Sequence, residues 1–208
     1  MSLFITFEGP DGSGKSTQVA RLAERLRALG LDVCLAREPG GTAIGDQIRA
    51  VLHDLQNTAM QPRAEILLYS ASRAQIVGEL IRPQLERGGV VLCDRYADST
   101  MAYQGYGHGL DLDVLRTITD FATGGLKPDL TLLLDLDVED GLKRRKSGGE
   151  WNRLDAYSSA FHQRVREGYH QLAAADLGRW VVIDASGEAE KVADAVWQAA
   201  KKKLEIGD

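Results

Sequence analysis

The residues most able to do chemistry form a glycine-rich segment near the N-terminus. Residues 9–16 read Gly-Pro-Asp-Gly-Ser-Gly-Lys-Ser, which matches the pattern G-x-x-x-x-G-K-[ST]. Glycines let successive backbone N–H groups point into one concavity, and the start of a following helix adds a favourable potential for anionic oxygens. Lys15 is placed to reach the β and γ phosphates of a nucleotide, and Ser16 offers a hydroxyl to Mg²⁺. The segment therefore predicts a phosphate-binding loop.

A second pair of charged residues follows a later apolar run. Asp94 and Arg95 come directly after Val90–Cys93. The carboxylate can hold magnesium through water, and the rigid guanidinium can donate twice to another phosphate. Taken alone, the pair could instead form a salt bridge at the end of a strand. The chain contains no Asn-Lys-x-Asp sequence, the motif that reads guanine in GTPases. It also contains no apolar run that ends in paired acidic residues. A kinase is therefore favoured over a GTPase or a motor.

The elements that must position these residues are short apolar runs separated by helical stretches. The runs are Leu3–Phe7, Val33–Ala36, Val90–Cys93, Leu130–Leu134 and Trp180–Ile183, and residues 18–29 show helical spacing of apolar side chains. Such alternation predicts an α/β, three-layer P-loop NTPase fold, with a five-stranded parallel sheet covered by helices on both faces. Ligands of such sheets bind at the carboxyl ends of the strands, where Glu8, Arg37, Glu38, Asp94 and Asp135 stand.

Composition limits the remaining possibilities. A chain of 208 residues with 44% hydrophobic and 26% charged residues suits one globular domain over residues 1–208. The net charge of −5 leaves no basic footprint for a nucleic-acid polymer. The absence of a long apolar run or a signal-peptide pattern predicts no membrane partner and a cytoplasmic location. Cys34 and Cys93 each sit in an apolar run and are expected to be buried and unpaired.

Several segments together resemble the thymidylate kinase family. They are residues 7–17 around the phosphate loop, Arg-Glu-Pro-Gly-Gly-Thr at 37–42, Leu-Leu-Tyr-Ser-Ala-Ser-Arg at 67–73, and Asp-Arg-Tyr at 94–96 with Ser99 and Thr100. The likeness spans residue 3 to about residue 185, and the 37–42 and 94–96 segments are far more specific than the loop. The resemblance implies a nucleoside monophosphate kinase that phosphorylates dTMP to dTDP with ATP and Mg²⁺ in dTTP biosynthesis, and it implies a homodimer.

The resemblance also implies roles for individual residues. Tyr69 stacks on thymine, where family members often carry Phe, and Arg73 reads the O4 atom of the base. A ring and an arginine four residues apart lie on one helical face, which agrees with this assignment. Arg95 takes the acceptor phosphate, and Tyr103 packs against the deoxyribose where a 2′-hydroxyl would protrude. The residues implied to bind dTMP are Asp11, Glu38, Tyr69, Arg73, Arg95, Ser99, Thr100, Tyr103 and Gln104. Those implied to bind ATP are Gly9, Pro10, Asp11, Gly12, Ser13, Gly14, Lys15, Ser16 and Thr17, and the metal falls to Ser16 and Asp94.

A catalytic arginine is missing from the phosphate loop, since position 11 is aspartate and residues 9–16 contain no arginine. A basic segment at about 143–153, around Gly148-Gly149, is predicted to be a mobile lid that supplies the charge. In this respect the chain resembles the type of thymidylate kinase, found in many bacteria, that carries its catalytic arginine in a lid. The resemblance also implies that adenine lies between the arginine end of this lid and the loop near residues 185–187. The predicted catalytic residues are Lys15, Arg95, Arg144, Arg145 and Arg153.

Two other functions stay open at this point. One is a kinase for another nucleoside monophosphate or a deoxynucleoside, which the same loop and fold could support. The other is a non-catalytic nucleotide-binding switch, which would bind ATP without acceptor-dependent turnover. The Asp94-Arg95 pair and the basic segment argue against the switch.

Overall fold

A parallel five-stranded sheet forms the centre of the molecule. The computed structural model describes residues 2–148 and 151–204, and the strands of this part are β1 (Leu3–Glu8), β2 (Val33–Arg37), β3 (Val90–Asp94), β4 (Leu130–Asp135) and β5 (Trp180–Asp184). Their order across the sheet is β2-β3-β1-β4-β5, and every neighbouring pair is parallel. The predicted fold class is confirmed, with each strand ending one residue later than its apolar run, on a charged residue.

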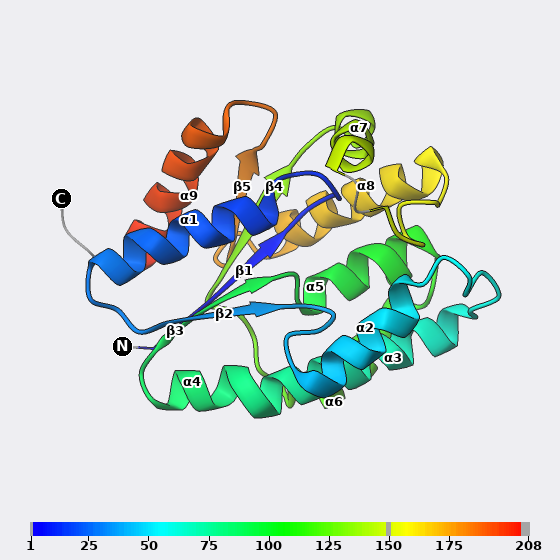
Figure 1. The fold of residues 1–208 in the computed structure, drawn as a ribbon, viewed down its shortest axis with the longest axis horizontal. Coiled ribbons are helices and arrows are strands. Elements are labelled where there is room, and N and C mark those ends of the chain that lie inside the picture. The colour runs from blue at the N-terminus through cyan, green and yellow to red at the C-terminus, as the bar shows by residue number, and fades with distance from the viewer. Residues whose placement is uncertain (1, 149–150, 205–208) are drawn as a thin grey trace.

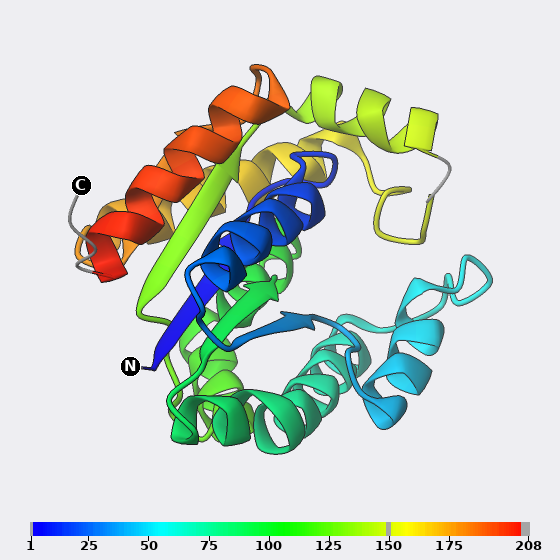
Figure 2. The same cartoon turned by 60° about the vertical axis from the view of Figure 1, so that its left-hand side comes forward.

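Helices cover both faces of this sheet (Figures 1 and 2). Helices α1 (Lys15–Ala28) and α9 (Ala189–Leu204) pack on one face, where Leu22 and Val196 join the core formed with Ile5 and Leu132. On the other face, α8 (Ser159–Ala175) contributes Val165 to a core that includes Leu133 of β4. Because inward-facing residues alternate along β1 and β4, both layers are held by apolar burial.

The remaining helical segments lie between β2 and β4 in the sequence or follow β4. They are α2 (Ala43–His53), α3 (Pro62–Ile76), the π-helical η1 (Val77–Ile81), α4 (Arg82–Glu86), α5 (Ala97–Thr100), the π-helical η2 (Met101–Gly107), α6 (Leu112–Thr123) and α7 (Val138–Gly148). Side chains cap several of them; Thr42 accepts from the backbone N–H of Gly45 at the start of α2, which satisfies a donor that the helix itself leaves unpaired. No helix in the described ranges is both long and apolar enough to cross a membrane.

Two local predictions differ from the structure. Residues 143–148 were expected in a loop but form the last part of α7, because Leu142 to Lys146 are good helix formers and the run 138–147 contains no proline. Cys93 is buried and Cys34 only half-buried, and both are free thiols.

Candidate active site

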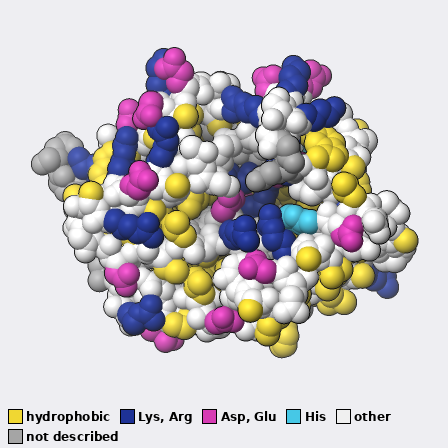
Figure 3. All heavy atoms as spheres, viewed as in Figure 1, with side chains coloured by type: hydrophobic (Ala, Val, Ile, Leu, Met, Phe, Trp, Pro, Cys, Tyr) yellow, Lys and Arg dark blue, Asp and Glu magenta, His cyan; other side chains and the backbone are white. Residues whose placement is uncertain are grey.

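A cavity of about 1060 Å³ opens at the carboxyl ends of β1, β2 and β3. Lysine and arginine side chains gather around the hollow on this face (Figure 3). Most of the predicted site residues line it, namely Asp11, Gly12, Gly14, Lys15, Ser16, Thr17, Glu38, Tyr69, Arg73, Asp94, Arg95, Ser99, Thr100, Tyr103, Gln104, Arg144 and Arg145. Ser13 instead lines a smaller cavity next to it. The predicted phosphate-loop and acceptor residues are thus brought to one place.

The phosphate loop connects β1 to α1 and needs glycine at specific positions. Gly9 and Gly12 have φ values of 136° and 79°, which side chains rarely adopt. A Cβ on Gly12 would also lie 2.2 Å from the carbonyl oxygen of Gly141 in α7. The loop therefore depends on glycine both for its curl and for its close contact with α7.

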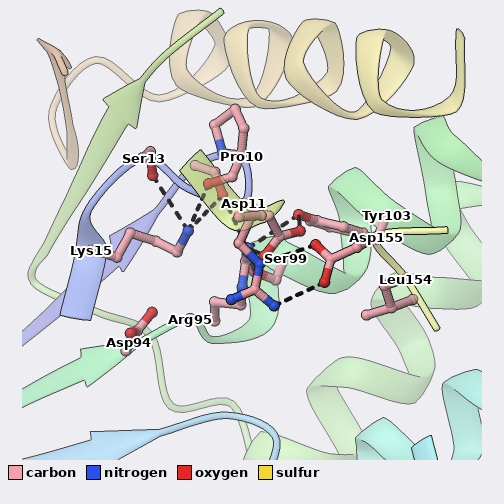
Figure 4. Close-up of polar contacts among 12 residues, drawn as sticks. Pro10, Asp11, Ser13, Lys15, Asp94, Arg95, Ser99, Tyr103, Leu154 and Asp155 are labelled. Carbon is pink, nitrogen blue, oxygen red and sulfur yellow. Dashed lines mark hydrogen bonds and ion pairs between the residues drawn. The ribbon is translucent and has the colours of Figure 1, made fainter. Parts of the chain in front are cut away.

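Lys15 is turned back onto the phosphate loop. Its Nζ donates to the carbonyl oxygens of Gly9 at 3.1 Å and Pro10 at 2.8 Å (Figure 4). Burial, together with repulsion from Arg95, lowers the pKa of Lys15 to about 8. The lysine is still largely protonated at neutral pH, and its ammonium is held by weak neutral acceptors that an anionic phosphate can replace.

Ser16 and Asp94 converge at the start of α1. The Ser16 hydroxyl donates to Asp94 Oδ2 at 2.5 Å. Asp94 lies in register with Phe7 of β1, close to where the loop begins, so the parallel sheet itself brings this carboxylate beside the loop. Hydroxyl and carboxylate oxygens are the ligands that Mg²⁺ prefers, and the strand-end salt bridge considered for Asp94 and Arg95 is not formed among the described contacts.

Arg95 lies beside the loop in a dense hydrogen-bond cluster (Figure 4). Its Nη2 donates to Asp11 Oδ1 at 2.7 Å and to the Tyr103 hydroxyl at 3.1 Å. Burial alone would raise the pKa of Asp11, but the charges of Arg95 and Lys15 hold it well below its ordinary value. The Arg95 backbone has a φ of 68°, an uncommon conformation for a residue other than glycine and one often found at functional sites.

A buried glutamate supports this cluster; the sequence placed it at the end of a strand but gave it no role in the site. Glu8 accepts from the backbone N–H of Tyr96 at 2.8 Å and from the hydroxyls of Ser99 and Tyr169 at 2.5 and 2.9 Å. The Tyr169 hydroxyl in turn accepts from Arg95 at 3.0 Å. Burial, with a contribution from Asp98, raises the pKa of Glu8 to about 7. Glu8 thus holds the backbone at Tyr96 and the hydroxyls of Ser99 and Tyr169, and Arg95 donates to the Tyr169 hydroxyl.

The predicted base-reading residues form the far wall of the cavity. Arg73 is fully buried; its Nε donates to Glu38 at 2.7 Å, and its Nη1 donates to the Thr100 hydroxyl at 2.9 Å. Burial raises the pKa of Glu38 to about 7, against the opposing charge of Arg73. The Tyr69 ring is buried beside Leu154. A flat apolar face and a set of fixed polar groups therefore meet at this wall.

The buried Arg73–Glu38 ion pair leads to a stability prediction. Arg73→Ala is expected to lower the free energy of unfolding by about 3–5 kcal/mol, because it leaves a carboxylate buried without its partner. Thermal and urea unfolding would measure the loss. The double variant Arg73→Ala, Glu38→Gln should recover part of it, since a neutral amide costs less to bury. Equal losses in the single and double variants would contradict this account.

Helix α7 carries two of the predicted lid arginines into the site. Arg145 donates to both oxygens of Asp155, with Nη2 2.8 Å from Oδ2. Arg144 donates to the carbonyl oxygens of Ala185 and Ser186 at 3.2 and 3.4 Å. Gly148 ends α7, and Gly149 lies outside the described residues. α7 therefore links the phosphate loop, which it touches at Gly141, to the loop after β5.

Arg153 is placed differently from the prediction. It is buried away from the phosphate loop, where Nη2 pairs with Glu65, Nε donates to the carbonyl oxygen of Leu52 at 3.0 Å, and Nη1 donates to the Tyr157 hydroxyl at 2.7 Å. It does not line the large cavity, whereas its neighbours Trp151, Asn152 and Leu154 do. Arg153 anchors the chain after α7, and a direct contact with phosphate stays a prediction.

Further basic residues line the cavity without having been proposed from the sequence. Arg49 and His53 lie on α2, and Arg49 donates to the carbonyl oxygen of Pro39 at 2.8 Å. Burial and the nearby charge of Arg49 lower the pKa of His53 to about 4. Their spacing of four residues indicates that Arg49 and His53 lie on the same face of a helix. Nothing in the sequence indicated that this helix faces the cavity.

The fold and the site define a P-loop phosphotransferase, with a phosphate loop at one end of the cavity and an arginine-lined pocket at the other. Comparisons with known proteins narrow this class. The profile of the thymidylate kinase family matches residues 7–196. A thymidylate kinase from Roseiflexus sp. (strain RS-1) is 57% identical, over 94% of this chain and 92% of that relative. One from Deinococcus radiodurans is 52% identical over 97% of each chain.

A solved structure agrees with these relatives. The crystal structure of thymidylate kinase from Ehrlichia chaffeensis is 33% identical, covers 96% of this chain and 98% of that one, and superposes with a TM-score of 0.80. The chain belongs to the thymidylate kinase family. It is an enzyme, a nucleoside monophosphate kinase that phosphorylates dTMP in dTTP synthesis. The predicted family, fold and activity are confirmed, and the non-catalytic switch is excluded.

Proposed function

We propose that ATP binds with its triphosphate in the loop 9–17 and that dTMP binds in the pocket between Arg95 and Tyr69. The observation that carries this is the single cavity, which joins the phosphate loop to a second anion-binding residue, Arg95. Two substrates bound end to end in one cavity would have their phosphates meeting between Lys15 and Arg95. This is the in-line arrangement that phosphoryl transfer requires.

The acceptor half of the cavity suits a deoxyribonucleotide carrying thymine. The Tyr69 ring offers a stacking face, and Arg73, Thr100 and Gln104 supply polar groups for the base edge. The Tyr103 hydroxyl donates to Asp11 Oδ2 at 2.6 Å, which holds the ring across the space assigned to the sugar. By the family resemblance, Asp11 would approach either the sugar 3′-hydroxyl or the magnesium shell. These contacts support dTMP as the acceptor.

Magnesium is the metal that these residues would hold. Ser16 and Asp94 supply oxygen ligands at the phosphate end of the cavity, and Mg²⁺ usually completes such a site with substrate phosphates and water. When bound, the ion would neutralise charge on the ATP phosphates. The described residues contain no group of three or more metal-ligating side chains, which suits an ion that arrives with the nucleotide.

The protein's own contribution is positioning and electrostatics. Lys15 and the arginines of α7 would balance negative charge on the transferred phosphoryl group, while Arg95 holds the acceptor phosphate. A general base is not needed, because a phosphate oxygen of the acceptor is already anionic near neutral pH. Glu8, Ser99 and Tyr169 keep the Arg95 guanidinium in place, so that little reorganisation is needed when dTMP binds.

Adenine would occupy the smaller cavity behind the phosphate loop. That cavity is lined by Ser13, Thr17, Arg144 and Gly187, among others. The Arg144 guanidinium is held there by the carbonyl oxygens of residues 185 and 186, where its plane can stack on a base. This supports the adenine position expected between the lid and residues 185–187.

Acceptor-dependent release of ADP tests the proposal. The purified chain with ATP and Mg²⁺ would be given dTMP, dUMP, dCMP, dGMP, AMP and thymidine. We expect dTMP to have the highest kcat/KM, and turnover to stop when EDTA removes the metal. A higher kcat/KM for another monophosphate, or for thymidine, would instead support the alternative of a kinase for a different acceptor.

We also propose that residues 1–208 act as one kinase domain in the cytoplasm, with a mobile lid at 143–153.

We further propose that two copies of the chain form a homodimer. Helices α3 and α6 pack together and expose Leu67 by 59%, Val114 by 56% and Phe121 by 90%. Exposed large apolar side chains on two helices that pack together are candidates for an interface. Sedimentation of the wild type and of Phe121→Glu tests this, since the charge should shift the equilibrium toward monomer.

A further inference from the structure

A buried carboxylate beside the acceptor pocket has no role in the mechanism described so far. Glu65 lies in the first turn of α3, and 1% of its side chain is exposed. Its Oε1 accepts a 2.7 Å hydrogen bond from Gln104 Nε2, and its Oε2 pairs with Arg153. His108 Nε2 lies 3.5 Å from the same Oε1. Glu65 therefore joins the pocket residue Gln104 to the segment that follows α7.

This contact determines which end of the Gln104 amide faces the cavity. An ionised carboxylate only accepts hydrogen bonds, so the group directed at Glu65 must be the amide NH₂. Burial alone would raise the pKa of Glu65, but the nearby His108, together with the hydrogen bonds from Arg153 and Gln104, holds it below its ordinary value. The carbonyl Oε1 of Gln104 is left for the cavity, and no described residue donates to it.

Glu65 is itself held in place. Arg153, which pairs with it, is fixed by the carbonyl oxygen of Leu52 and the Tyr157 hydroxyl. An isolated glutamine amide can rotate by 180° and exchange its donor and acceptor ends. Here such a rotation would place the carbonyl oxygen of Gln104 against the carboxylate of Glu65, with no hydrogen bond between them. The acceptor end is therefore locked toward the substrate.

We propose that Glu65 is a positioning residue that sets base specificity, by holding the Gln104 amide so that its oxygen accepts from a pyrimidine N3–H. The inference rests on the proposed placement of the acceptor base between Tyr69, Arg73 and Gln104. Thymine and uracil carry a hydrogen on N3, whereas N3 of cytosine is itself an acceptor. Two acceptors facing each other leave both unpaired in a buried site, which gives strong discrimination against cytosine.

Glu65→Gln tests this proposal with three acceptors. The new amide can donate as well as accept, so Gln104 becomes free to present either end. We expect the ratio of kcat/KM for dTMP over dCMP to fall by about tenfold or more. The ratio for dTMP over dUMP should stay within about twofold of the wild type, because both bases keep N3–H and differ only in a methyl group. An unchanged dTMP/dCMP ratio, or an equal fall in both ratios, would overturn the proposal.

A double-mutant cycle separates positioning from a general effect on the pocket. In the Gln104→Leu variant the amide is gone. Adding Glu65→Gln to it should therefore give the same dTMP/dCMP ratio as Gln104→Leu alone. A further fall in that background would overturn the proposal. Glu65→Gln alone could fail to fold, because it leaves the Arg153 charge buried without a carboxylate. In that case the double variant Glu65→Gln, Arg153→Met, which removes the charge of Arg153, is assayed in the same way. The single variant Gln104→Leu tests the placement of the base, and a dTMP/dCMP ratio unchanged in that variant would refute the placement rather than the role of Glu65.

Discussion

Lys15→Ala is expected to lower kcat by roughly 10²- to 10³-fold, the loss typical when one preorganised donor to transition-state charge is removed. In the structure Nζ rests on the carbonyl oxygens of Gly9 and Pro10. It can turn from there to the phosphates without leaving the loop. Because the charge it meets develops on the transferred group, the effect should fall on turnover far more than on acceptor binding.

Single-turnover rates and calorimetric titration with dTMP would separate these effects. Lys143→Ala is a matched control, since Lys143 is an exposed residue of α7 that pairs with Asp140 and does not line the cavity. It removes the same charge and should leave the single-turnover rate within about threefold, as expected for an exposed ion pair. A large loss of dTMP affinity with normal turnover in Lys15→Ala would refute the assigned role.

The sheet and the phosphate loop were predictable because their signals are local. A parallel strand buried on both faces appears in the sequence as a continuous apolar run. The charged residue that follows each run, such as Glu8 or Asp94, is the last residue of the strand. The glycines at 9 and 12 are required by the backbone itself. Helix α7 was missed as a helix because its charged residues and low apolar content are also typical of a solvated loop.

Contacts between distant elements were not predictable in the same way. Glu8 meets Ser99 and Tyr169 across 91 and 161 residues of sequence, and Glu65 meets Arg153 across 88. Glu8, Ser99 and Arg153 stood out in the sequence, but not for these contacts. Glu65 and Tyr169 read by themselves as ordinary helix residues. Only the packing of α3, α8 and η2 around the cavity shows that they support Arg95 and Gln104, and a single sequence contains no signal for that packing.

Arg153 illustrates why composition of a segment does not assign roles within it. It belongs to the basic region that was predicted as a lid, and it is charged like its neighbours in sequence. However, Arg153 points inward and pairs with Glu65. Arg144 and Arg145 instead extend from α7 toward the cavity. The direction in which each side chain leaves the backbone separates an anchor from a candidate catalytic group.

The arginines of α7 carry the last prediction. With no arginine in the phosphate loop, their removal should expose charge in the transition state, and arginine fingers in related transfers are worth roughly 10³- to 10⁵-fold in rate. At least one of Arg144→Ala and Arg145→Ala is expected to lower kcat by about a hundredfold or more, with ATP affinity changed much less. Arg153→Ala should act differently, by destabilising the fold by about 3–5 kcal/mol when Glu65 loses its partner.

Stopped-flow single-turnover assays on the three single variants and the triple variant would measure the chemical step apart from product release, and thermal unfolding would measure stability. The triple variant guards against redundancy, because Arg144 and Arg145 both line the cavity and either could approach the phosphates. If Arg144→Ala and Arg145→Ala, singly and together with Arg153→Ala, keep near-normal single-turnover rates, the segment only covers the site. The missing positive charge would then have to come from another arginine on the cavity wall, and Arg37 and Arg49 would be the next residues to substitute.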